Sequence, residues 1–364
     1  MSDSGDRSLS AGALPARANL EHLKNEAKQR LRSLRAQNPA ARLAEAQLLV
    51  ARGYGFPSWR RMKAYVDALN DGGQRLINAV RDGDLKTLRE VLDRHPELVN
   101  ARTEIDQRAL MPVDYTGAPA KPRKMLTLPL LHLAIVGGKI DALRLLIGRG
   151  ADVNARNADG RLPLHDCFEL NHDDFASILL EAGAAVDVCA ATAYGMNERL
   201  QEILEEYPED ANDLQTGNSP LGWAAYGHRP VAARILVEHG AIVDRAPYDA
   251  KAWEPAAMVA AKEVARVLLE HGADVNWRDS GGNTAIHCVI RSRIVLDPAE
   301  FVRVLIEFGA DLSMRNSDGR TALEEALVQT GKNAETYFPI RPIAAKRLER
   351  AVELLRARGE QMRT

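Results

Sequence analysis

Three histidines stand at matching places in the sequence, and imidazole is a common acid–base and metal-binding group. His132, His165 and His287 each follow a Leu or Ile near the start of a short apolar segment. Stacked helices that carried them would place neighbouring imidazoles roughly 10 Å apart. Because zinc ligands lie only about 2 Å from the metal, these histidines are not expected to share one zinc ion.

A second candidate for chemistry is the run His165-Asp166-Cys167, which contains a base, a carboxylate and a nucleophile. Adjacent side chains on a helix do not face one another, so a Cys–His pair would need a partner from elsewhere. The other cysteines are Cys189 and Cys288, and none of the three belongs to a CxxC pair. An odd number without such pairs predicts neither a disulfide framework nor a zinc knuckle, and it favours a reducing compartment.

The recognised catalytic motifs are missing from the sequence. There is no GxxxxGK[ST] loop, no GxGxxG after a strand, and no HExxH or GxSxG. The pair Gly281-Gly282 is typical of a turn, and Glu205-Glu206 and Asp173-Asp174 are expected on solvated helix faces or caps. The sequence therefore predicts no catalytic residue, no cofactor and no metal site.

The elements that would position these residues form an internal repeat. One phrase appears as LRLLIGRGADVNARNADGR (143–161) and returns four times, most clearly as ARVLLEHGADVNWRDSGGN (265–283). The alanine after its glycine falls at 151, 184, 241, 273 and 310, so the intervals are 33, 57, 32 and 37 residues. The long interval contains a degenerate copy, 196–212, which is similar to the opening copy, 84–100. We count eight units in residues 74–359.

Each unit also has a front half, such as LPLLHLAIVGG (128–138) or SPLGWAAYGH (219–228). The order of a TPLHxAA-like segment, a helix of LLxxGADVN type and a DGxT turn resembles the ankyrin repeat. The resemblance covers roughly 285 of the 364 residues. It implies an all-α solenoid of helix-turn-helix units with short β-hairpin turns, in which the histidines hydrogen-bond backbone groups and link neighbouring units.

The residues support this fold without the resemblance. Pro163 and Pro220 stand where helices would begin and where a missing N–H is tolerated. Glycines after each apolar-periodic helix can adopt the left-handed conformation that ends it. The Leu-rich stripe before them is too wide for one helix pair to bury, so stacked neighbours must bury it.

Two insertions interrupt the array, at residues 103–127 and 329–342. Long loops in compact folds are usually functional or disordered. The alternative to a binding protein is therefore an enzyme, or an enzyme accessory, whose pocket these insertions build. The first insertion offers Asp106, Arg108, Asp114, Tyr115 and Lys121 as material for such a pocket.

The N-terminal part differs from the array. Residues 1–18 are rich in Ser, Gly and Ala and are expected to be a disordered tail. Residues 19–70 have helical periodicity, and the stretch resembles a helical segment that precedes ankyrin arrays in some bacterial proteins. Residues 17–63 contain 11 Lys or Arg against three Asp or Glu, a balance of +8. This basic segment could bind nucleic acid or an acidic partner, but a solvated face or a head docked on its own array is expected.

Bulk composition is that of an ordinary globular protein. The chain is 46% hydrophobic, 27% charged and 5% aromatic, with a net charge of −2. No signal-like segment and no apolar run of 18 residues occurs. We expect a cytoplasmic protein without a membrane partner, and nucleic acid is not the expected ligand.

The resemblance implies a protein–protein interaction scaffold or adaptor that binds on its concave face and hairpin tips. Aromatic residues and Arg dominate the energy of such interfaces. The expected partner-binding residues are Tyr194, Tyr226, Tyr248, Trp253, Met258, Trp277, Arg278, Arg156 and Arg315. Trp223 stands at a framework position and is expected to pack inside. The partner is a protein whose identity the sequence does not specify.

Overall fold

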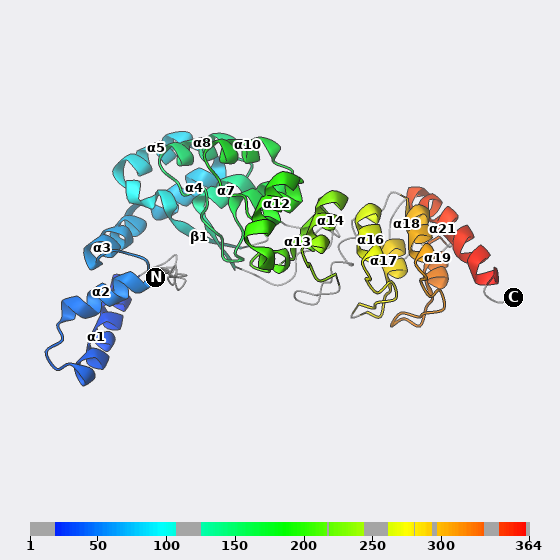
Figure 1. Ribbon diagram of the computed structural model, residues 1–364. Helices are drawn as coiled ribbons and strands as arrows, with labels where there is room; N and C mark the ends of the chain where they lie inside the picture. The colour runs from blue at the N-terminus through cyan, green and yellow to red at the C-terminus, as the bar shows by residue number, and fades with distance from the viewer. Residues whose placement is uncertain are drawn as a thin grey trace. The chain divides into compact units, whose positions relative to one another are not determined.

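A computed structural model describes residues 19–106, 125–216, 218–243, 261–279, 281–292, 297–330 and 342–361. Within these ranges the chain is mostly helical, and short helices follow one another in pairs (Figure 1). The all-α repeat architecture expected from the sequence is therefore confirmed, whereas the number of eight units stays a prediction. The chain divides into two compact halves, Met1–Ala185 and Val186–Thr364.

The described elements of the N-terminal half begin with α1 (Leu20–Gln37), α2 (Leu43–Gly53), α3 (Trp59–Ala68), a π-helical turn η1 (Leu69–Gly73), α4 (Gln74–Asp82), α5 (Leu85–Arg94) and the 3₁₀ turn η2 (Pro96–Asn100). They continue with β1 (Arg102–Asp106), β2 (Met125–Pro129), α7 (Leu130–Val136), α8 (Ile140–Gly148), α9 (Pro163–Glu169) and α10 (Asp173–Glu181).

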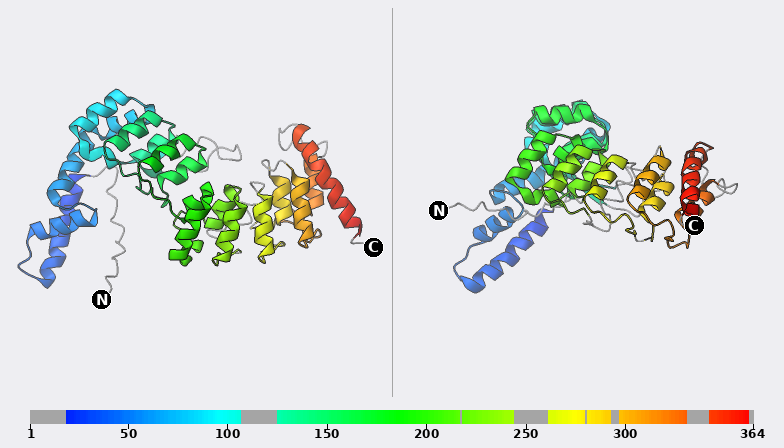
Figure 2. Two further views of the ribbon diagram at one scale, coloured as in Figure 1. Left: turned by 45° about the horizontal axis from the view of Figure 1, so that its top comes forward. Right: turned by 45° about the vertical axis from the view of Figure 1, so that its right-hand side comes forward.

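The described elements of the C-terminal half are α11 (Val188–Tyr194), α12 (Asn197–Glu206), η3 (Pro208–Asn212), α13 (Pro220–Tyr226), α14 (Pro230–Glu238), α16 (Lys262–Glu270), α17 (Ala285–Arg291), α18 (Pro298–Glu307), α19 (Ala322–Thr330) and α21 (Pro342–Gln361). Within each half, successive helix pairs lie side by side in sequence order (Figure 2).

The helices α1, α2 and α3 pack around a small apolar core of their own. Leu23 and Ala27 of α1 share this core with Met62 and Val66 of α3, and all four are at most 1% exposed. Ser58 caps the start of α3, because its side chain accepts a hydrogen bond from the N–H of Arg61.

No loop separates α3 from the first repeat. Helical structure runs without a break through α3, η1 and α4, from Trp59 to Asp82. In the π-helical turn, Asp71 Oδ2 lies 2.8 Å from His95 Nε2 at the end of α5, and this hydrogen bond lowers the pKa of Asp71. Beside them, a Cβ on Gly72 would lie 3.1 Å from Val91 Cγ1. The basic segment is thus joined to the first repeat by a continuous helix and by side-chain packing.

A repeat consists of a short inner helix, a tight loop and an outer helix that a glycine ends. The glycines after the outer helices have φ between 83° and 86°, a conformation that carries a steric penalty for residues with a Cβ. These glycines are Gly150, Gly183, Gly240, Gly272 and Gly309. The repeated glycines of the sequence therefore end the helices for the reason expected.

Asparagine side chains connect one repeat to the next. In each case the Oδ1 atom accepts a hydrogen bond from a backbone N–H just after the next outer helix, over 2.7 to 2.9 Å. The pairs are Asn100 with Asp152, Asn154 with Ala185, Asn212 with Ile242 and Asn276 with Asp311. These bonds satisfy N–H groups that no helix can satisfy, so they fix the spacing of neighbouring repeats.

The two insertions differ at their edges from the loops that the sequence suggested. Strands β1 and β2 pair in antiparallel fashion from Arg102↔Pro129 to Asp106↔Met125, so the first insertion begins and ends as a β-ribbon. Residues 107–124 lie outside the described residues. In the second insertion α19 extends to Thr330 and α21 begins at Pro342, while residues 331–341 lie outside the described part.

The last described helix, α21, packs against α18 and α19 and closes the array. Its buried residues include Ala351 and Leu355. None of the described helices combines the length and the apolar character needed to cross a lipid bilayer.

Candidate partner-binding surface

Two of the three matching histidines, His132 and His287, link segments of the fold. His132 Nδ1 lies 2.6 Å from Asp166 Oδ2, and its Nε2 lies 2.7 Å from the Ala155 carbonyl oxygen. His287 Nε2 donates to the Arg320 carbonyl oxygen over 3.0 Å, and its Nδ1 lies 2.9 Å from Thr284 Oγ1. Both ring nitrogens of His132 and of His287 are therefore occupied. The backbone hydrogen bonds that the resemblance implied are confirmed at both positions.

The thiol of Cys167 is not activated as a nucleophile. Its side chain is fully buried, and burial raises the pKa of the thiol far above its ordinary value. The thiolate, which is the reactive form, is therefore disfavoured. The neighbouring carboxylate of Asp166 is bound to His132 of the preceding repeat. Within the described residues, no group of three or more His, Cys, Asp or Glu is arranged to hold a metal ion.

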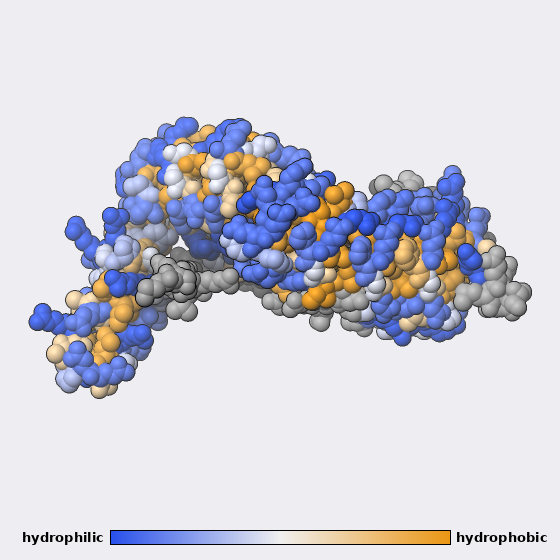
Figure 3. Space-filling view, viewed as in Figure 1, coloured by the Kyte–Doolittle hydropathy of each residue, from blue (hydrophilic) through white to orange (hydrophobic). Residues whose placement is uncertain are grey.

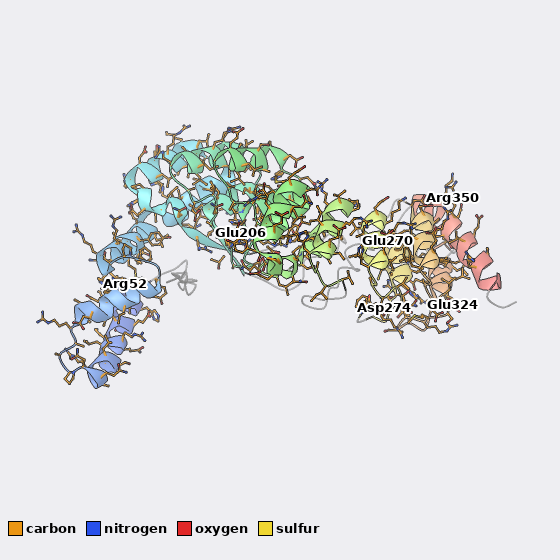
Figure 4. All side chains as sticks on the ribbon, in the orientation of Figure 1. Arg52, Glu206, Glu270, Asp274, Glu324 and Arg350 are labelled. Carbon is orange, nitrogen blue, oxygen red and sulfur yellow. The ribbon has the colours of Figure 1, made fainter. Side chains whose placement is uncertain are left out.

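Glu324 of α19, labelled in Figure 4, stands at the repeat position where other copies have histidine. Its Oε2 accepts the N–H of Thr321 over 2.9 Å, just as His165 Nδ1 accepts the N–H of Leu162 over 3.0 Å. This backbone hydrogen bond, together with the guanidinium of Arg315, lowers the pKa of Glu324. The carboxylate thus serves as a helix cap.

The three arginines expected at the hairpin tips also hold those tips together. Each guanidinium donates to the carbonyl oxygen of the glycine four residues later, over 2.6 to 3.2 Å. The pairs are Arg156 with Gly160, Arg278 with Gly282 and Arg315 with Gly319. Arg278 and Arg315 are exposed and Arg156 is half-buried. Their side chains reach the surface, but they are already engaged in the turns.

The aromatic residues considered from the sequence differ in their exposure. Tyr226, the last residue of α13, is 42% exposed. Tyr194, the last residue of α11, and Trp277, at a hairpin tip, are half-buried. Trp223 is 1% exposed, and its Nε1 donates to Thr216 Oγ1 over 3.0 Å, which confirms a packing role. The remaining expected residues, Tyr248, Trp253 and Met258, lie outside the described residues.

Sequence reasoning missed Val231, which is 57% exposed in the first turn of α14. Comparison of the repeats in the sequence could have identified this residue. The residue ten positions before the repeat alanine is Asp141, Asp174, Glu263 or Glu300 in four copies, and Val231 in this one. A carboxylate in the first turn stabilises a helix through its dipole. This repeat therefore lacks that stabilisation and exposes an apolar side chain instead.

A second carboxylate is replaced in the same repeat. Ile242, which is 49% exposed, follows the repeat alanine where Asp152, Asp274 and Asp311 stand in other copies. Figure 3 shows hydrophobic residues gathered on the surface over α13 and α14. Exposed apolar patches of this kind mark interaction sites more often than scattered single residues do.

The loop between α13 and α14 has an unusual backbone. His228 is exposed and has a φ of 53°, in the left-handed region that glycine adopts in several other repeats. Such a residue costs free energy that the surrounding structure must supply. We call Tyr226, His228 and Val231 the α13–α14 corner, since all three lie where the inner helix turns into the outer one.

Comparison with protein families gives the same repeat along most of the array. A model described as ankyrin repeats (3 copies) matches residues 76–190 and 188–279, and one described as ankyrin repeats (many copies) matches residues 268–326.

Curated relatives match over parts of their length. The chain is 38% identical over 87 residues to the NF-kappa-B inhibitor cactus of Drosophila melanogaster, which is 21% of this chain and 17% of that protein. It is 28% identical over 183 residues to the human Ankyrin repeat and SOCS box protein 16, covering 44% of this chain and 40% of that protein. The mouse B-cell lymphoma 3 protein homolog is 28% identical over 182 residues, covering 46% and 40%. The chain thus spans less than half the length of these relatives.

Among solved structures, the crystal structure of the ankyrin repeat domain of Bcl-3 matches 54% of this chain and 92% of that one, with 25% identity and a TM-score of 0.35.

Proposed function

Because the chain belongs to the ankyrin repeat family, we propose that it is a scaffold or adaptor that holds a protein partner on its array. The relative cactus is by its name an inhibitor of another protein, NF-kappa-B, which supports a role in protein binding. The proposed contact surface is the α13–α14 corner together with Tyr194 and the hairpin tips that carry Arg278 and Arg315. The partner and the biological process are left open by this proposal.

The observation that carries the proposal is the exposed apolar character of the α13–α14 corner. Tyr226 and Val231 are both large side chains that the fold leaves in water, at 42% and 57% exposure. Tyrosine is enriched among residues that dominate binding energy, and burying an apolar side chain such as valine contributes roughly 1.5 to 3 kcal/mol. A partner that covers this corner would remove both from water.

The arginines at the hairpin tips are further evidence for the proposed contact surface. Arg278 and Arg315 are exposed, yet their guanidinium groups are held in place by carbonyl oxygens of the turns. A side chain that is ordered before binding loses less entropy when a partner arrives. Such arginines can donate hydrogen bonds to a partner's carboxylate, or stack on its aromatic ring, at low entropic cost.

The alternative of an enzyme with a pocket built by the insertions depends on residues 107–124 and 331–341, which lie outside the described residues. No observation in the described residues favours it. The cytoplasmic location and the bacterial source also remain predictions from the sequence.

The proposal is tested by changing one exposed tyrosine and comparing it with another. A partner isolated with the full chain and identified by mass spectrometry is purified, and its affinity is measured by calorimetry. Tyr226→Ala should weaken binding by about tenfold or more, as expected for an interface anchor. Tyr207→Ala is the matched control, because Tyr207 is 46% exposed at the end of an outer helix.

Unchanged thermal unfolding must accompany both substitutions. Equal affinity of wild type and Tyr226→Ala, or an equal loss with Tyr207→Ala, would contradict the proposed surface.

A further inference from the structure

One face of α1 carries a stripe of positive charge. Lys24, Lys28 and Arg32 are exposed and follow one another at i, i+4 and i+8, and Arg35 continues the stripe. Residues at this spacing lie above one another on a helix, so the stripe from Lys24 to Arg32 is about 12 Å long. The buried residues Leu23 and Ala27 lie on a different face, turned toward α2 and α3.

Within the stripe two side chains have contacts in the same segment. Lys24 Nζ lies 3.1 Å from Glu21 Oε2, and Arg35 Nε donates to the Ala41 carbonyl oxygen over 3.2 Å. The first contact is an exposed ion pair, which contributes little, and the second is a part-buried hydrogen bond to the backbone. Arg52 of α2 adds a further exposed positive charge to the segment (Figure 4).

One face of α12 carries the opposite charge with the same spacing. Glu198, Glu202 and Glu206 are exposed at i, i+4 and i+8, and Glu205 is exposed beside them. The surface over α12 is hydrophilic in Figure 3, and Figure 4 labels Glu206 at the end of the helix. The buried residues Leu200, Ile203 and Leu204 lie on the other face and pack on the array. Residues 197–213 contain seven Asp or Glu and one Arg.

We propose that α1 of one copy docks along α12 of a second copy, so that the protein self-associates through these two stripes. Three charges on each helix at the same interval can be matched in register, because both helices have the same rise per residue. Every copy carries both stripes, so a second copy of the chain supplies the complementary helix for either stripe. The occupant of the acidic face is therefore a segment of the same chain.

The strength and salt dependence of this association follow from the exposure of the charged side chains in both stripes. All the paired side chains lie in solvent, where single ion pairs contribute little, so the dimer is weak and its formation depends on several pairs acting together. Raising NaCl from about 50 mM to about 500 mM shortens the screening length from roughly 14 Å to roughly 4 Å. The dimer should then dissociate. The inference is independent of the proposed function, because neither stripe belongs to the α13–α14 corner or to the hairpin tips.

The test is a charge swap followed by sedimentation velocity of the full chain. Wild type should form a dimer at low salt, and its dissociation constant should rise by about tenfold or more at high salt. Lys28→Glu with Arg32→Glu places like charges against α12 and should give a monomer. Glu202→Lys with Glu206→Lys should do the same. An equimolar mixture of the two reversed proteins should restore the dimer, and so should one chain that carries all four changes.

The matched control is Glu349→Lys with Glu353→Lys on α21, an exposed i, i+4 carboxylate pair outside both stripes. It makes the same change in net charge as Glu202→Lys with Glu206→Lys and should leave the dimer intact. A wild-type monomer at low salt overturns the inference, as does a mixture of reversed proteins that stays monomeric. Salt-sensitive binding of duplex DNA by a wild type that does not dimerise would assign the basic stripe to nucleic acid instead.

Discussion

Val231→Glu should make the protein more stable and a poorer binder at the same time. The change restores the carboxylate that other repeats have at this position, in the first turn of an outer helix. A negative charge there interacts favourably with the helix dipole by about 0.3 to 1 kcal/mol, and Glu has a higher helix propensity than Val. Because Val231 is already 57% exposed, little apolar burial is lost. We expect the free energy of unfolding to rise by about 0.5 to 1 kcal/mol.

Binding should change in the opposite direction. If a partner covers the α13–α14 corner, it would have to desolvate the new carboxylate, and an unpaired buried charge is costly. A loss of about 2 kcal/mol corresponds to roughly a thirtyfold weaker affinity. Urea unfolding measures the first effect, and calorimetry with the isolated partner measures the second.

The matched control reverses the substitution in the next described outer helix. Glu263→Val in α16 removes the equivalent carboxylate, so it should destabilise the protein by a similar amount and leave affinity unchanged. The reasoning is refuted if folded Val231→Glu binds as tightly as wild type. It is also refuted if the two substitutions weaken binding equally.

Two further predictions concern how the repeats hold together. Gly222→Ala should stabilise the protein by less than the roughly 1 kcal/mol that Ala gains over Gly in a helix, because its Cβ would lie 2.1 Å from Asn218 Oδ1 and the Asn218 side chain must move. Urea unfolding should show a larger gain in an Asn218→Gly background, and an equal effect in both backgrounds would contradict the steric explanation. Burial lowers the pKa of His287 below its ordinary 6.5, so the unfolded state binds the proton more readily. Its contribution to stability should be fully present above about pH 6.5 and should be lost as the pH falls through the lower folded pKa. His287→Gln should flatten this part of the stability–pH curve, and an unchanged curve would show that another group titrates.

Much of the fold follows from residues that act locally. Glycine ends the outer helices α8, α10, α14, α16 and α18 because it alone tolerates the left-handed conformation without penalty. Its recurrence every 32 to 37 residues in the regular copies is visible in the sequence. Ser58 begins α3 for an equally local reason, since its side chain caps a nearby N–H. The matching positions of the histidines within the repeats are likewise visible in the sequence.

Other features depended on contacts between distant residues. The sequence suggested a loop for residues 103–127, but cross-strand pairing of Arg102–Asp106 with Met125–Pro129 makes its edges a ribbon. It gave no sign that helical structure would continue through Leu69–Gly73, a π-helical turn in which Asp71 is hydrogen-bonded to His95.

The types of the residues predicted only part of the candidate partner-binding surface. Aromatic and Arg content directed attention to Tyr226, Arg278 and Arg315, but type alone does not reveal whether a side chain is exposed or already bonded. The tip arginines donate to carbonyl oxygens of their own turns, which depends on how each turn folds. Val231 could have been found by asking which repeat lacks the usual carboxylate.

The sequence by itself determined the class of fold and the repeat, because both rest on helix stops and apolar spacing that act within a few turns of chain. Only the tertiary structure decided which side chains remain in water, because exposure depends on what neighbouring repeats cover. It also placed Lys24, Lys28 and Arg32 along one open face of α1, and Glu198, Glu202 and Glu206 along one of α12. Helical spacing aligns each stripe, but packing of the opposite face keeps it exposed.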